Sequence, residues 1–448
     1  MASDLGQPDA VAGAAAVDAD PVPTGTSTAT AKKLLGRSAA ASWLPLAILV
    51  GLAGVQSFDF NAFGILAPDI RHTFHLSVAS ITVISTFTSA LPVVFSVHLG
   101  YYGARHNRIR ISAVMGVIWG VTAILTGLAP VVTVLIAARL LGGVGQLTTE
   151  TVYPSLLADF FPAADLGKIF TRYRWQSQAL GLIGGPLAGF FAAAFGWRIA
   201  FIALAIPTFV FVFFLYALTE PLRGASMGYS LGDDPVTSVR QGFKRVKEIR
   251  ALRRTWVAAF LFGAGTLPLP TLLNNFFAGV YHLGDTDRGL ISLFYGIGGL
   301  VGILLGGRMS TRMLNAGRIK ALPVVCGLLI VECGVGISLV GAFPFVAISV
   351  AATCVATIGA SGFLPAYTTL VAFVAAPRLR AQAYGWSLLF YALGAITLQA
   401  GVIGPIINAY GQRWALVALG VLVTAGGVVG ISTRTFVDAD MARAFSGE

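Results

Sequence analysis

Long apolar runs recur along almost the whole of this 448-residue chain, and they strongly limit the folds open to it. A helix that crosses a lipid bilayer needs roughly 20 mostly apolar residues. Hydrophobic residues make up 56% of the chain and charged residues 11%, against about 25% charged in soluble domains. We therefore predict an all-α membrane protein with twelve transmembrane helices. The twelve runs cover residues 43–67, 77–102, 110–130, 132–160, 170–195, 197–219, 255–282, 288–307, 320–342, 344–375, 381–409 and 412–434.

The longest break between apolar runs divides them into six and six. It predicts two six-helix bundles joined by a linker. The predicted parts are a disordered cytoplasmic tail at 1–42, a bundle at 43–219, the linker at 220–254, a second bundle at 255–434 and a C-terminal tail at 435–448. Within the linker, apolar residues recur at helical spacing from Val239 to Leu252 among many basic ones. This pattern indicates either an amphipathic helix resting on anionic headgroups or a basic, solvated linker.

A trace of internal repetition supports the two bundles. Gly185-Pro186 precedes Gly196-Trp197-Arg198 in the fifth and sixth runs, and Gly404-Pro405 precedes Gly411-Gln412-Arg413 in the eleventh and twelfth. Equivalent positions of the two halves thus carry equivalent turn residues.

The basic residues are distributed unequally between the two sides of the predicted membrane. Of the 30 Lys and Arg, 25 fall on the side of the termini and linker, among them Lys168, Arg172 and Arg174, and four fall on the other side. Positive loops stay in the cytoplasm. We therefore expect a multi-pass protein of the inner (plasma) membrane with both termini in the cytoplasm.

Composition and motifs exclude several classes of function. The basic residues form no stripe interleaved with aromatics, as nucleic-acid binding requires. Cys326, Cys333 and Cys354 lie in apolar runs, which is typical of small core residues. The sequence has no Gly-x-x-x-x-Gly-Lys-[Ser/Thr] loop and no His-Glu-x-x-His motif. We expect no enzyme activity or catalytic residues, no metal or cofactor, and no nucleic-acid or obligate protein partner.

Ionisable residues within the apolar runs are few, and their cost in hydrocarbon marks them as candidate functional residues. The clear cases are Asp59, Arg139, Glu150 and Glu332. Asp59 lies about 24 Å along the first helix from its cytoplasmic start, and Arg139 about 10 Å below the outer start of the antiparallel fourth helix. Their depths match. We expect an ion pair that either locks the two helices together or takes part in gating or proton coupling.

Glu150 lies on the same face of the fourth helix as Arg139. Eleven residues separate them, which returns to within roughly 20° of the same direction. Gln146, Thr149 and Tyr153 gather on adjacent turns, so this polar face is predicted to line a cavity. A carboxylate there could take up and release a proton as the cavity opens to either side. The alternative is a structural carboxylate near the inner surface.

The second half offers polar side chains of its own. Each could line the cavity or form a hydrogen bond between helices. The candidates are Asn274, Asn275, Tyr295, Tyr367 and Gln399.

Motifs in the first half resemble those of the major facilitator superfamily, and the resemblance extends from about residue 43 to 434. The segment from Gly100 to Arg108 is similar to the family's basic loop motif, with Arg105 and Arg108 placed to reach helix ends and Ala104 where the family carries Asp. The segment that begins Arg139-Leu-Leu-Gly resembles the helix-four motif whose buried Arg is linked to proton transfer.

The fifth run carries the most specific motif. Gly181, Gly185, Pro186 and Gly189 match the pattern Gly-x-x-x-Gly-Pro-x-x-Gly that is associated with antiporters of this family. Small residues at this spacing let helices approach closely, and a proline bends its helix by removing a backbone donor.

Within the family, the first and fourth runs look similar to Spinster-like lipid transporters and bacterial drug exporters. The matching segments are Ser57-Phe58-Asp59 and Arg139 to Pro154. Gln146 and Phe60 stand where Spinster-like proteins carry Glu and Arg.

The resemblance implies transport by alternating access between two bundles. A cavity with few charges and many Phe and aliphatic residues favours a hydrophobic or amphipathic small molecule as substrate. Proton-coupled efflux is therefore the leading expectation, with the lipid bilayer and protons as the other partners. The alternatives are proton-coupled uptake of a small organic acid or sugar by symport, and a membrane sensor or scaffold that does not transport.

Overall fold

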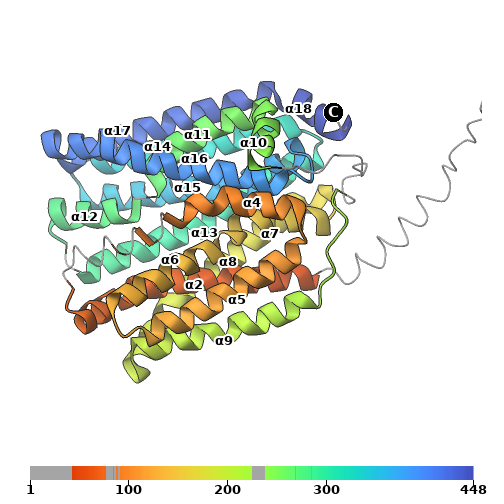
Figure 1. Ribbon diagram of the computed structural model, residues 1–448. Helices are drawn as coiled ribbons and strands as arrows, with labels where there is room; N and C mark the ends of the chain where they lie inside the picture. The colour runs from red at the N-terminus through yellow and green to blue at the C-terminus, as the bar shows by residue number, and fades with distance from the viewer. Residues whose placement is uncertain are drawn as a thin grey trace, which may run out of the picture. The chain divides into compact units, whose positions relative to one another are not determined.

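The computed structural model describes residues 43–76, 84, 87–88, 91–224, 238–267, 269–283 and 285–446, and every regular element among them is a helix (Figure 1). The predicted tail at 1–42 and most of 77–90, where the second apolar run begins, lie outside the described residues. The first half contains α2 (Trp43–Phe74), the short η1 (Leu91–Phe95), α4 (Ser96–Arg105), α5 (Arg108–Leu128), α6 (Val132–Gln146), α7 (Thr148–Phe160), η2 (Ala163–Asp165), α8 (Leu166–Phe195) and α9 (Trp197–Tyr216).

The second half follows a connecting helix, α10 (Val239–Glu248). It contains α11 (Arg250–Thr266), α12 (Leu269–Tyr281), α13 (Asp285–Asn315), η4 (Ile319–Ala321), α14 (Leu322–Ala342), α15 (Val346–Val374), α16 (Arg380–Leu398), the π-helical turn η5 (Gln399–Ile403), α17 (Gly404–Ser432), η6 (Thr433–Thr435) and α18 (Val437–Ser446). We call the end of the helices that carries α10 and α18 the linker end, and the opposite end the far end (Figure 1).

Eight helical segments in the described part of the chain are long and apolar enough to cross a membrane. The other predicted spans are shortened, polar or joined to a neighbour. The seventh is divided into α11 and α12, and the eleventh and twelfth run together through η5 and α17. Helix α8 carries Lys168, Arg172 and Arg174 in its first turns; the first two are exposed, and Arg174 faces a cavity between the halves.

The two halves repeat one packing pattern. In the first half α2 packs on α8 and α5 on α9, and in the second half α11 packs on α16 and α14 on α17. The turn glycines predicted to be equivalent share one backbone conformation, since Gly196 and Gly411 both have φ of 83°. Each lies beside an arginine that closes a helix end. Arg198 donates to Ala129 O at 2.9 Å, and Arg413 donates to Phe343 O at 2.8 Å.

The halves meet along two seams, α4 with α16 and α8 with α13. At the first seam a Cβ on Gly100 would lie 2.6 Å from Ala381 O, so only glycine allows this approach. At the second, Gly307 leaves no room for a side chain beside Thr171. Both contacts lie toward the linker end, where the halves are therefore closed against each other.

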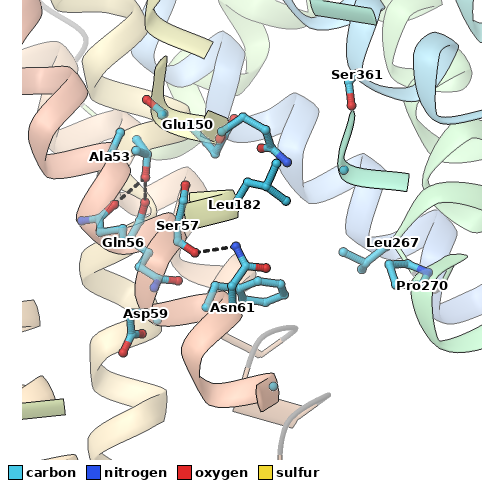
Figure 2. A pocket seen from close by; sticks show the side chains of 18 of the residues that line it. Ala53, Gln56, Ser57, Asp59, Asn61, Glu150, Leu182, Leu267, Pro270 and Ser361 are labelled. Carbon is cyan, nitrogen blue, oxygen red and sulfur yellow. Dashed lines mark hydrogen bonds between the residues drawn. The ribbon is translucent and has the colours of Figure 1, made fainter. Parts of the chain in front are cut away.

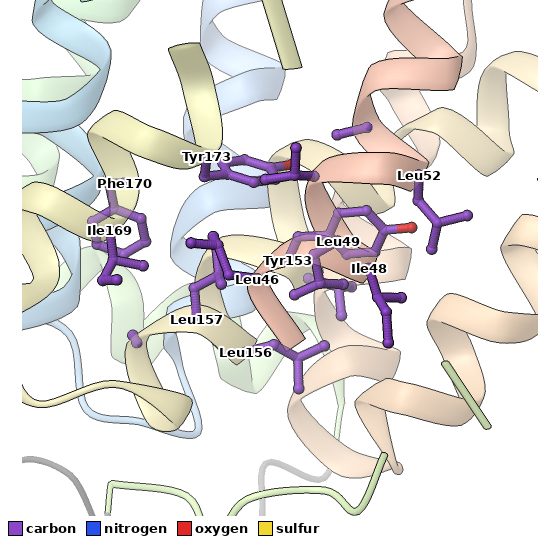
Figure 3. Close-up of a cluster of buried hydrophobic side chains, with 14 of the residues drawn as sticks. Leu46, Ile48, Leu49, Leu52, Tyr153, Leu156, Leu157, Ile169, Phe170 and Tyr173 are labelled. Atoms are coloured by element: carbon purple, nitrogen blue, oxygen red, sulfur yellow. The ribbon is translucent and has the colours of Figure 1, made fainter. Parts of the chain in front are cut away.

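One buried core beneath the linker end is built mainly from the first half. Leu49, Leu156, Leu157 and Phe170 are fully buried there, in a cluster that also contains Tyr153 and Tyr173 (Figure 3). This cluster ties α2, α7 and α8 together, and so fixes the frame on which the polar residues of these helices are held.

The linker helix is present, and Phe243 and Val246 on its apolar face pack against protein. Phe243 of α10 lies 4.4 Å from the Trp386 ring and 5.8 Å from the Trp256 ring, and Val246 is fully buried. The C-terminal segment is also docked, because Val437 is buried and Asp440 accepts a hydrogen bond from Ala251 N at 2.6 Å. Both helices thus cap the second half.

Candidate functional site

A cavity of about 830 Å³ lies between the two halves. Its first wall is polar, with Gln56, Ser57 and Asn61 of α2 facing inward, and its second wall carries Leu267 and Pro270 (Figure 2). The cavity reaches Gly64 and Ile291, both toward the far end of their helices. Its composition, with charge on one side and mostly apolar surface on the other, suits a small ligand that has both characters.

The Asp59–Arg139 ion pair expected from the helix depths is present. Arg139 Nη1 donates to both carboxylate oxygens of Asp59 at 2.9 and 2.8 Å. The guanidinium also lies 4.5 Å from the Phe63 ring and 5.7 Å from the Phe201 ring, which adds cation–π attraction. The Asp59 side chain is only 2% exposed. Although both residues line the cavity, this carboxylate is sealed behind its partner.

Glu150 lies where the fourth predicted span is interrupted. Helix α6 ends at Gln146, α7 begins at Thr148, and Pro154 lacks the N–H that would bond the Glu150 carbonyl. Glu150 is thus in the first turn of α7, where the helix dipole favours an acidic side chain. The neighbouring Thr149 donates to Gln56 Oε1 at 2.9 Å, which ties this turn to α2.

Arg174 of α8 holds the Glu150 carboxylate in a two-pronged pair. Its Nη1 and Nη2 donate to Oε1 and Oε2 at 2.5 and 2.7 Å. The Arg174 side chain is 12% exposed, whereas that of Glu150 is 38% exposed, and both line the cavity. The Glu150 carboxylate is therefore accessible from the cavity while it remains paired, unlike that of Asp59.

Arg174, counted in the sequence among the basic residues on the side of the termini and linker, lies inside the protein. Four residues before it, Phe170 is already fully buried, and Tyr173 is 1% exposed, so the helix is inside the protein by this point. The signal in the sequence is that the fifth predicted run, 170–195, already includes Arg174. The consequence is that the cavity holds two arginines and two carboxylates, each paired.

The other predicted lining residues divide into two groups. Gln146, Asn274 and Tyr295 line the cavity. Four do not. Tyr153 is fully buried in the core of the first half, because Pro154 and the break at Leu147 turn this part of the helix away. Asn275, Tyr367 and Gln399 lie elsewhere in the second half.

Those three have identifiable surroundings. Asn275 lines a separate hollow of about 150 Å³ with Gln412. Gln399 donates to Ala264 O at 2.8 Å, which bonds η5 to α11. Tyr367 lines a side pocket within the second half. Glu332 lies half-buried on α14 and lines neither of these two spaces nor the main cavity.

The glycine pattern of α8 brings it close to α2. Asn61 donates to Gly181 O at 3.0 Å, and a Cβ at Gly181 would lie 2.7 Å from Ser57 Cβ. Gly185, Pro186 and Gly189 follow within the same helix. The close approach lets backbone of α8 form part of the cavity wall.

A buried charge cluster closes the linker end. Asp159 of α7 accepts from Arg108 of α5 at 2.6 Å and from Arg380 of α16 at 2.8 Å. All three side chains are at most 1% exposed. Arg108 also donates to Glu220 at 2.9 Å. One carboxylate therefore bridges the two halves at the end where they touch.

The loop motif that lacks its family aspartate is completed differently. Arg105 donates to Tyr101 within its own helix and is exposed. Arg223, which follows α9, instead donates to the Gly103, Ala104 and His106 carbonyls at the end of α4. Burial, aided by the nearby Arg108, lowers the pKa of Arg223 to about 10, so its guanidinium stays charged at neutral pH.

Two helical bundles around a central cavity, closed against each other at one end, define a secondary membrane transporter. Comparison with known proteins gives the same class. The Major Facilitator Superfamily pattern matches residues 49–398, and the chain belongs to that superfamily, whose members are transporters and not enzymes.

The curated relatives have low sequence identity to this chain, but they match it over most of its length. The chain is 23% identical to the uncharacterized transporter YybO of Bacillus subtilis (strain 168), over 71% of this chain and 76% of that protein. It is 23% identical to protein spinster homolog 1 of Homo sapiens, over 92% of this chain and 84% of that one. Spinster proteins are thus among its relatives. The proton:xylose symporter XylE has the same fold, with a TM-score of 0.65 at 14% identity, covering 87% of this chain and 95% of that one.

Proposed function

We propose that this secondary transporter carries a small organic anion together with a proton. The observation that carries the proposal is the Glu150–Arg174 pair, whose acidic member is open to the cavity. Arg139, the other arginine of the cavity, is already paired with Asp59. Arg174 supplies a second cation in the cavity, which could bind an anion. Uptake of an organic acid with protons therefore has more support than the apolar runs alone indicated.

Electrostatics explains how the pair couples the two ligands. While Glu150 is ionised it satisfies Arg174 at 2.5 and 2.7 Å, and an entering anion would meet a carboxylate as well as a guanidinium. Protonation of Glu150 removes that competition and leaves Arg174 free to bind the anion. Because each ligand favours the other, the proton and the anion bind together.

The remaining ion pairs have different tasks in this proposal. Asp59 is sealed behind Arg139, so this pair holds α2 against α6. In this proposal the ion pair breaks only when these two helices move apart. The Asp159 cluster holds the linker end closed while the cavity lies toward the far end. Breaking the Asp159–Arg380 contact is then a necessary step in opening the linker end.

The excess of basic residues at the linker end supports a cytoplasmic location for that end, in the inner (plasma) membrane, even without Arg174. A reporter that fluoresces only in the cytoplasm, fused after Glu448, tests this. Fluorescence is expected, and its absence in cells that express the full-length fusion would reverse the orientation.

Export of a hydrophobic or amphipathic molecule is the second candidate function. The apolar wall contributed by Leu267, Leu273 and Phe277 favours it, as does the antiporter-type pattern in α8. In an exporter that exchanges protons for substrate, the proton and the substrate compete. The two candidates therefore predict opposite effects of acid on substrate binding.

Flux in proteoliposomes tests the leading proposal. Purified protein is supplied with a panel of organic anions, including alkyl sulfonates, which stay ionised and cross lipid poorly. Uptake should rise when the outside is acidic. Arg174→Gln should lower it about 30-fold or more, because the anion loses the cation that binds it. Arg172→Gln, an exposed cation on the same helix, is the matched control and should leave uptake unchanged.

Glu150→Gln separates coupling from binding. This variant imitates the protonated state, so it should still exchange anion across the membrane but should no longer respond to a pH gradient. Accumulation that still follows the gradient in Glu150→Gln would contradict the proposal, as would full uptake by Arg174→Gln.

A further inference from the structure

A second hollow of about 360 Å³ lies beside the Glu150–Arg174 pair. Apart from these two side chains, its walls come entirely from the second half, between Thr255 of α11 and Thr433 of η6. It is large enough to enclose much of a small organic ligand. We call it the side pocket.

The side pocket adjoins the main cavity. Both spaces are bounded by the same residues where they meet, namely Glu150, Arg174, Tyr295, Ser361, Leu364 and Leu388. The ion pair therefore lies where the side pocket and the main cavity adjoin. A molecule bound to Arg174 could extend from the cavity into the pocket.

The side pocket is lined mainly by rings and aliphatic groups. Phe262 and Phe363 pack edge to face at 4.6 Å, and Ile330 and Leu370 add aliphatic surface. Two of its tyrosines already use their hydroxyl groups in bonds to the protein. Tyr384 donates to Thr368 O at 2.7 Å, and Tyr391 accepts from Thr266 at 3.1 Å. These tyrosines thus offer mostly ring surface to a ligand.

Arg174 has one side-chain donor that Glu150 does not use. Its Nε is buried and has no hydrogen-bond partner among the described residues, although both Nη atoms are used by Glu150. A buried donor without an acceptor is costly, so a movement of the pair that exposes Nε to an acceptor on a ligand would be favoured.

We propose that the transported anion is amphipathic, with its anionic group at Arg174 and its apolar body, aliphatic or aromatic, in the side pocket. This inference rests on the proposed anion transport and adds the substrate class to it. Because the walls of the side pocket belong to the second half, a body bound there would keep its contacts when the two halves rock against each other.

A homologous series of alkyl sulfonates, from methanesulfonate to octanesulfonate, tests this proposal. Proton-driven uptake of labelled methanesulfonate into proteoliposomes is measured first, and its inhibition by each longer member gives an apparent affinity for that member. Affinity should rise about fourfold for each added methylene until the pocket is filled, because each buried methylene contributes about 0.8 kcal/mol.

Two substitutions fill the pocket from different helices, Ala259→Leu on α11 and Ala360→Leu on α15. Each should weaken octanesulfonate at least tenfold and leave methanesulfonate unchanged, which also shows that the variant is folded. Ala351→Leu, at an exposed position of α15, is the matched control and should alter neither.

The outcomes separate the two proposals. If methanesulfonate is transported with protons but chain length has no effect, the side-pocket inference is wrong and the proposed function stands. The side-pocket inference is also wrong if the filling variants weaken all chain lengths alike. If no member of the series moves with protons, both proposals are overturned.

Discussion

Asp59 and Arg139 illustrate how much a single buried ion pair contributes to the stability of the folded protein. Removing one member leaves the other as an uncompensated charge, which costs about 3–5 kcal/mol. We expect Asp59→Ala to lower thermal stability in detergent by about that amount, and Asp59→Ala combined with Arg139→Met to recover part of it. Asp165→Ala, which removes a surface pair with Lys168, should cost less than about 1 kcal/mol. Equal losses for the two single variants would contradict a structural role for the Asp59 pair.

Asp159 is a second residue whose role can be isolated. Asp159→Asn weakens its bonds to Arg108 and Arg380 and removes the negative charge that these two buried cations share. The linker end should open more often. Spin labels at Arg105 and Asn315, both exposed at this end, should then report a larger population of long distances.

The control for this experiment is Asp165→Asn on the adjacent turn, whose side chain is half exposed. It should leave the distance distribution unchanged. An unchanged distribution in Asp159→Asn would mean that the glycine contacts alone keep the end closed.

Single residues were predictable from the sequence when their depth in the membrane could be counted. Asp59 and Arg139 meet because their distances along antiparallel helices match. Arg174 was missed because it lies close to the start of an apolar run, where arginine usually belongs to a loop. Tyr153 was misplaced because helical periodicity was carried through the break at Leu147, which the sequence did not reveal.

Helix α10 shows what determines the position of an amphipathic element. Its apolar side chains at Phe243 and Val246 match the helical spacing in the sequence, but periodicity cannot say whether lipid or protein covers them. In this structure aromatic rings cover Phe243, including Trp256 and Trp386. The helix is therefore part of the second half.

Replacing Phe243 tests this docking. Phe243→Ala should lower the free energy of unfolding by about 2 kcal/mol, less than for a fully buried phenylalanine because the ring is half-buried. Lys247→Ala, exposed on the same helix, should have little effect. The measurement is thermal unfolding in detergent. Losses of the same size in both variants would show that α10 is not held by its aromatic face.

The whole molecule was the most predictable level. Twelve apolar runs, the break after the sixth and the paired turn glycines indicated two repeated bundles, and the family match and the fold confirm this architecture. The state of the two halves could not be predicted, because it depends on contacts such as Gly307 with Thr171 that join residues far apart in the chain.

The contact between α8 and α13 at Gly307 can be tested in the complete transporter. Gly307→Leu would force α13 away from α8 and should hold the linker end open, so transport should fall at least tenfold while the protein remains folded. Gly401→Leu is the control, because no atom lies within 4 Å of a Cβ placed there. Normal transport by Gly307→Leu would show that this close approach is not needed in the cycle.

The central claim is that Glu150 takes up a proton when an anion binds Arg174. The most direct test is to add octanesulfonate to purified protein in weakly buffered solution and to follow pH with an indicator dye. We predict that protons are taken up as the anion binds, with no uptake in Glu150→Gln although that variant still binds the anion. Anion binding without proton uptake, or the same uptake in Glu150→Gln, would contradict this mechanism.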